Sequence, residues 1–107
     1  MDEIFECVDK LTTNLVNSDV YQNYLLAKKS LDTDDMNSLR EFKNLHFKFV
    51  SGVQNNFDTE KIISSLYSKL MLKPQTRSFL QNELLLTDCI KKIYTKFSEA
   101  LEIETFY

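Results

Sequence analysis

The sequence contains very few residues that interrupt helices. Its 107 residues include one glycine and one proline, the two residue types least compatible with a helix interior. Apolar residues recur every three to four positions over nearly the whole length, which is the spacing of one face of an α-helix. The sequence therefore predicts an all-α protein: an antiparallel multi-helix bundle of about five helices, in a single domain over residues 1–107.

Residue types that carry catalysis or bind metals are also scarce. The single histidine, His46, would have Phe42 and Phe49 as helical neighbours, so we interpret it as a partly buried or rim residue and not as a catalytic base. Cys7 and Cys89 lie far apart and form no Cys-x-x-Cys pair, which leaves no ligand set for a metal. No glycine-rich turn could hold a phosphate. We expect a protein that is not an enzyme, with no catalytic residue, cofactor or metal.

The net charge and the N-terminal residues indicate which cellular location and which classes of partner to expect. Thirteen basic and 16 acidic residues give a net charge of −3, which offers no general attraction to nucleic acid. The chain begins Met1-Asp2-Glu3-Ile4, acidic where a signal or transit peptide would be basic. No apolar run approaches the ~20 residues of a membrane span. We expect a cytoplasmic protein with no membrane partner, and direct nucleic-acid binding is disfavoured.

The first third of the chain predicts two helices. Apolar residues fit one helical face over residues 2–17. The polar stretch 17–19 breaks this pattern, and Ser18 is a good N-cap for a restart. The second helix ends in the acidic turn 32–35.

The middle of the chain predicts two more helices. Thr33 or Asp34 can cap the third, and Gly52 lies near its end, where it either permits a close helix contact or marks fraying. The stretch 55–59 is the most loop-like in the chain. Asp58 is predicted to cap the fourth helix.

The last predicted helix runs from Pro74 to about Glu102. Proline fits the first turn of a helix, and the apolar positions that follow alternate steps of four and three, interrupted only by Glu83. A helix of about 40 Å is longer than a compact domain of this size conveniently covers, so we expect it to meet a second subunit in a dimer or larger oligomer. The predicted interface residues are Phe79, Leu86, Ile90, Ile93 and Phe97, and the alternative is that they form an intrachain core.

Lysines on the last helix leave an alternative open. Lys91, Lys92 and Lys96 form a small basic patch, and Lys69 and Lys73 form another. A solvated polar face is the simpler interpretation, because glutamates are interspersed and the chain has only two arginines. The alternative function is a nucleic-acid-associated regulator that uses the first patch.

The order of these features resembles the YlbF/YmcA family of small all-helical bacterial regulatory proteins. The resemblance covers about residues 8–101. Leu11 and Leu15 precede Ser18, and a stripe of Tyr21, Tyr24, Ala27 and Leu31 leads through a polar turn to Leu39, Phe42 and Leu45. The most specific part is Pro74-x4-Phe79-Leu80-x2-Glu83. Lys73 stands where an asparagine is common in the family.

The resemblance implies a non-enzymatic adaptor that self-associates or pairs with related helical proteins. Such proteins act in the regulation of competence, sporulation, biofilm formation or RNA processing, so an RNA-processing protein is a further implied partner. Some relatives hold an iron-sulfur cluster in a cysteine-rich tail. Residues 101–107 contain no cysteine, so this property is not carried over.

Overall fold

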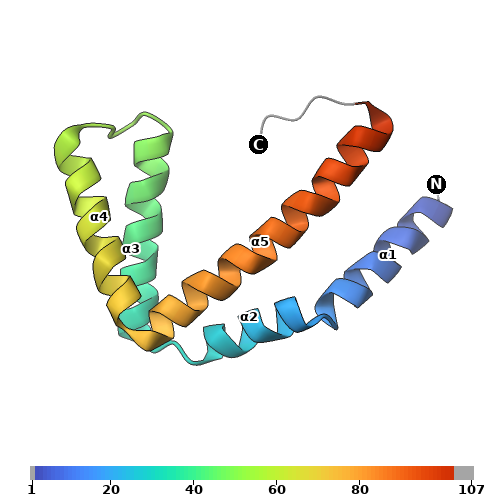
Figure 1. The fold of residues 1–107 in the computed structure, drawn as a ribbon, viewed down its shortest axis with the longest axis horizontal. Coiled ribbons are helices and arrows are strands. Elements are labelled where there is room, and N and C mark those ends of the chain that lie inside the picture. The colour runs from blue at the N-terminus through green and yellow to red at the C-terminus, as the bar shows by residue number, and fades with distance from the viewer. Residues whose placement is uncertain (1, 103–107) are drawn as a thin grey trace. The chain divides into compact units, whose positions relative to one another are not determined.

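The computed structural model describes residues 2–102 and contains five α-helices in that range (Figure 1). They are α1 (Asp2–Val16), α2 (Asp19–Lys29), α3 (Thr33–Val50), α4 (Phe57–Leu72) and α5 (Pro74–Leu101). No strand occurs among residues 2–102. The prediction of an all-α protein of about five helices with a long C-terminal helix is confirmed.

The chain divides into two compact units. Unit 1 comprises Met1–Leu26 with Gln81–Tyr107, and unit 2 comprises Ala27–Leu80. Unit 1 therefore holds α1, most of α2 and most of α5, whereas unit 2 holds α3, α4 and the first turns of α5. The single domain over residues 1–107 remains a prediction.

Polar side chains cap the starts of α2 and α4. At α2 the Ser18 hydroxyl accepts a hydrogen bond from the Tyr21 N–H at 3.3 Å, so the predicted cap is confirmed. At α4 the cap is Asn56 and not the predicted Asp58, because the Asn56 side chain accepts from the Thr59 N–H at 2.8 Å. Asp58 lies inside the first turn, where a carboxylate interacts favourably with the positive end of the helix.

Helix α3 begins with a capping box. The Asp32 carboxylate accepts from the Asp35 N–H at 2.7 Å, and the Asp35 carboxylate accepts from the Asp32 N–H at 3.1 Å. The cap is thus Asp32, and the prediction of Thr33 or Asp34 was wrong. Asp32, Thr33 and Asp34 are all residue types that can act as N-caps, so residue type alone did not distinguish them. The actual cap is Asp32, because it exchanges hydrogen bonds with the residue three positions later.

A glycine lies at the end of α3, and a proline begins α5. Gly52 follows the C-cap Ser51 with a φ of +83°, and its N–H donates to the Phe49 carbonyl at 3.2 Å. Apart from Gly52 and its two chain neighbours, no atom of residues 2–102 lies within 4 Å of a Cβ built at Gly52, so this glycine terminates the helix and does not permit a close helix contact. Pro74 is the first residue of α5, as predicted.

Helices α3 and α4 lie side by side and antiparallel in unit 2 (Figure 1). The rings of Phe42 and Tyr67 meet across this pair with centroids 5.7 Å apart. Unit 2 also contains every buried apolar side chain of residues 2–102, namely Ala27, Leu39, Leu70 and Phe79. The core of the described chain is therefore small and lies in unit 2.

Candidate functional site

Helix α5 exposes an apolar face within unit 1. Ile90 is 42% exposed and Phe97 is 52% exposed, and Leu86 and Ile93 are half-buried. These four residues, here called the α5 face, follow one another at steps of four, three and four and so share one side of the helix. Phe79, the fifth predicted interface residue, is only 6% exposed and belongs to the core of unit 2.

Helix α1 carries a second exposed apolar face. No residue of α1 is buried. Ile4, Phe5, Val8 and Leu11 are all exposed, Ile4 to 61%, and they recur at helical spacing. We call these four residues the α1 face.

The apolar side chains of the two faces remain partly exposed, so unit 1 does not gain the full free energy of burying them. Fully burying a Val, Leu, Ile or Phe side chain stabilises a structure by about 1.5–3 kcal/mol, so covering a half-exposed one contributes about 1 kcal/mol. Several such residues on each helix add up to several kcal/mol. Contiguous exposed apolar surface of this kind marks an interaction site in soluble proteins.

Charged side chains join the start of α3 to the start of α5 in unit 2. The Lys73 ammonium forms an ion pair with the Asp35 carboxylate, which is buried, and lies 3.5 Å from a carboxylate oxygen of Asp32. The hydrogen bond from the Asp35 N–H is the main cause that lowers the pKa of Asp32, and Lys73 lowers it further. The hydrogen bond to Asp35 is the main cause that raises the pKa of Lys73.

Sequence reasoning missed this pair. The sequence pattern groups Lys73 with Lys69 in a basic patch and does not connect either lysine with the acidic turn 32–35. The signal that could have identified the pair is a lysine directly before the helix-opening Pro74, in a chain with one isolated acidic turn. Lys73 and Asp35 are separated by 38 positions in the sequence, so this contact is a property of the tertiary structure.

Pro74 leaves one backbone carbonyl near the end of α4 without its usual helical hydrogen-bond donor. Because proline has no N–H, it cannot donate the helical hydrogen bond to the Leu70 carbonyl four residues earlier. The Thr76 hydroxyl donates to that carbonyl instead, and it also contacts the Lys73 carbonyl at 3.2 Å. Thr76 is 1% exposed, so water cannot substitute for it. At the junction of α4 and α5, one buried hydroxyl thus donates the hydrogen bond that Pro74 cannot.

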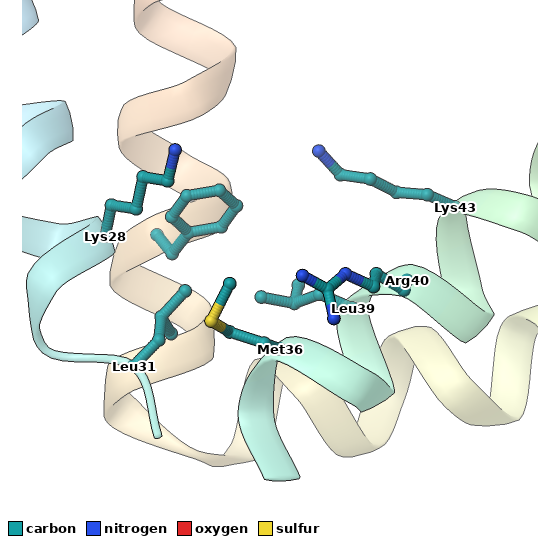
Figure 2. Close-up of a pocket in the computed structure, with 7 residues that line it drawn as sticks. Lys28, Leu31, Met36, Leu39, Arg40 and Lys43 are labelled. Atoms are coloured by element: carbon teal, nitrogen blue, oxygen red, sulfur yellow. The ribbon is translucent and has the colours of Figure 1, made fainter. Parts of the chain in front are cut away.

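Unit 2 also has a small pocket of about 110 Å³, called here the unit 2 pocket (Figure 2). Its lining combines an apolar floor with a cationic rim. The floor consists of Leu31, Met36, Leu39 and Phe79. The rim consists of Lys28, Arg40 and Lys43.

The remaining candidates for chemistry are distributed over α1, α3 and α5. His46 is exposed and stacks on Phe42, with ring centroids 5.8 Å apart. Cys7 is exposed, Cys89 is half-buried, and both are free thiols. Glu83 is half-buried. Within residues 2–102 no three His, Cys, Asp or Glu side chains gather as a metal site would require.

The lysine patch of the alternative function lies on α5 in unit 1. Lys91, Lys92 and Lys96 are all exposed. Lys92 and Lys96 line an open cavity of about 420 Å³ together with Asp88 and apolar side chains. The acidic and apolar neighbours make this a poor phosphate-binding surface.

Comparison with known proteins decides the family. The family described as control of the competence regulator ComK, YlbF/YmcA, matches residues 4–102. The chain belongs to the YlbF/YmcA family. The resemblance inferred from Pro74, Phe79 and Glu83 is thereby confirmed, and membership supports a regulatory role.

One curated relative of this YlbF/YmcA member is a UPF0342 protein from Desulfitobacterium hafniense (strain Y51). It is 24% identical over 104 residues, which cover 92% of this chain and 84% of the relative. No solved structure matches the chain. Among the residues of this YlbF/YmcA member that the structure describes, no helix is both long and apolar enough to cross a bilayer.

Proposed function

We propose that this protein is a non-enzymatic cytoplasmic adaptor that regulates other proteins by binding them and that self-associates through the α5 face. The observation that carries the proposal is the exposure of Ile90 and Phe97 on a helix of 28 residues. The family supports a regulatory role in competence control. The link to sporulation, biofilm formation or RNA processing belongs to the proposal alone.

The exposed faces support a protein partner over a small-molecule substrate. An enzyme active site is usually a concave pocket in which polar groups converge. Here the exposed apolar side chains recur along helices, and another helix can cover such a surface. The α5 face would then contact a second copy or a related family member, and the α1 face could contribute to the same contact.

The experiment compares the solution mass of the wild-type protein and an Ile90→Glu variant by light scattering over a concentration series. A carboxylate forced into a dry apolar interface costs several kcal/mol. We expect the wild type to be a dimer or larger and the variant to dissociate at least about 100-fold more readily, which corresponds to about 3 kcal/mol.

The matched control is Thr95→Glu. Thr95 is exposed and lies about 140° around α5 from Ile90, so the same charge enters the opposite side of the helix. This variant should keep the wild-type mass. An Ile90→Glu protein of unchanged mass would refute the proposed surface. A variant that loses its helical circular dichroism would instead place Ile90 in an intrachain core.

A further inference from the structure

We propose that the unit 2 pocket binds an acidic peptide segment of a partner protein, with one aliphatic side chain in the pocket and carboxylates on its rim. The pocket lies wholly within unit 2, and none of its lining residues belongs to the α5 face or the α1 face. This inference is therefore independent of self-association through α5.

The size and lining of the pocket select the anchor. Leu31, Met36, Leu39 and Phe79 provide an apolar floor, of which Leu39 and Phe79 are buried. The volume of about 110 Å³ is below the ~150 Å³ of a protein cavity that holds benzene. One Leu, Ile or Met side chain fits such a space, whereas a long acyl chain does not.

The rim selects the charge of the ligand. The chain as a whole is acidic, with a net charge of −3, yet three cations gather at this pocket. Within residues 2–102, neither Lys28 nor Arg40 forms an ion pair. The Lys43 ammonium lies 5.5 Å from the centre of the Phe79 ring, which places it over the apolar floor.

The arrangement of the cations favours a peptide over a small anion. Figure 2 shows Lys28 on one side of the pocket and Arg40 with Lys43 on the other. A single carboxylate at the end of a chain can reach only one side. A peptide with acidic residues before and after its anchor reaches both sides, and the Arg40 guanidinium can bind a carboxylate through two parallel hydrogen bonds.

The test measures binding of a fluorescein-labelled peptide, Asp-Glu-Leu-Glu-Asp-Gly, by fluorescence anisotropy. Two matched peptides separate the two contributions: one has serine in place of leucine, and the other has Asn and Gln in place of Asp and Glu. We expect saturable binding of the first peptide and at least about tenfold weaker binding of both others. Rising salt should weaken the binding of the acidic peptide.

The protein variants localise the binding. A Lys28→Glu/Arg40→Glu protein should lose at least about tenfold in affinity, because two attractive contacts become repulsive. The control Lys29→Glu/Lys69→Glu has the same net charge and changes two exposed lysines outside the pocket. It should stay within about threefold of wild type. Arg40→Gln removes one charge without reversing it and guards against a folding defect.

Several results would overturn the proposal. Equal loss in both double variants would mean nonspecific attraction, and equal binding of the amide peptide would exclude recognition of charge. Displacement of the labelled peptide by decanoate as readily as by the unlabelled peptide would assign the pocket to small anionic amphiphiles. Absence of saturable binding up to about 1 mM peptide would leave the pocket without this role. The Ile90→Glu protein should bind the peptide like wild type, so failure here is distinguishable from failure of the proposed oligomer.

Discussion

Replacing Thr76 by valine should destabilise the protein although the two side chains have nearly the same shape. The Thr76 hydroxyl donates to the Leu70 carbonyl, which Pro74 cannot serve because proline lacks an N–H. Leu70 is 5% exposed and Thr76 is 1% exposed, so in the variant the carbonyl stays buried without this donor. The structure therefore predicts a loss of stability, which the burial of apolar surface alone would not predict.

The size of the loss follows from two opposing contributions. A buried acceptor left without a partner costs about 1–3 kcal/mol. The extra methyl group of valine returns at most about 0.8 kcal/mol of burial. We expect a net loss of about 1–2 kcal/mol, which for a domain of this size lowers the melting temperature by roughly 5–10 °C.

The assay is thermal and urea unfolding followed by far-ultraviolet circular dichroism at one fixed protein concentration, because the proposed self-association would raise the apparent stability. Thr76→Ser is the matched control: it keeps the hydroxyl and loses the methyl group, at a cost of up to about 0.8 kcal/mol. A Thr76→Val protein that is as stable as wild type, or more stable than Thr76→Ser, would refute the role assigned to the hydroxyl.

Three further predictions concern the caps of α3 and α4. Asn56→Ala should lower the free energy of unfolding by about 1 kcal/mol, because the Thr59 N–H loses its acceptor. Asp58→Ala should cost less, and the reverse order in urea unfolding would restore Asp58 as the cap. The lowered pKa of Asp32 means that its contribution to stability is present above its unfolded pKa of about 3.9 and is lost as pH falls through the lower folded value. The raised pKa of Lys73 means that its contribution is present below about pH 10.4 and is lost as pH rises through the higher folded value. Urea unfolding over pH 2–12 should show both declines, and an Asp32→Asn protein that keeps the full acid decline would contradict the first.

Local rules predicted most of the helix boundaries. Ser18 caps α2 and Pro74 opens α5 because each acts through its own backbone geometry and its nearest neighbours. The same rules failed by one or two residues at α3 and α4. Several adjacent polar residues could serve as caps at both places, and only the formed helix shows which one reaches the free N–H groups.

The positions of the predicted interface residues on α5 were predictable in part. Periodicity correctly indicated that Leu86, Ile90, Ile93 and Phe97 share a side of one helix, since residues three or four apart lie on the same face. The same periodicity also included Phe79, because a continuous seam does not reveal where its environment changes. In the structure Phe79 lies in the core of unit 2, and its contacts there come from residues far away in the sequence.

The sequence alone determined the helices and the family, because helix propensity, apolar spacing and the single proline act over a few residues. The tertiary structure decided which charges and hydroxyls meet. The contact of Lys73 with Asp35 and the cations around the unit 2 pocket each depend on how separate helices pack. Side chains dozens of residues apart become neighbours only when α3, α4 and the start of α5 share one core, and no pattern within a single helix encodes that distance.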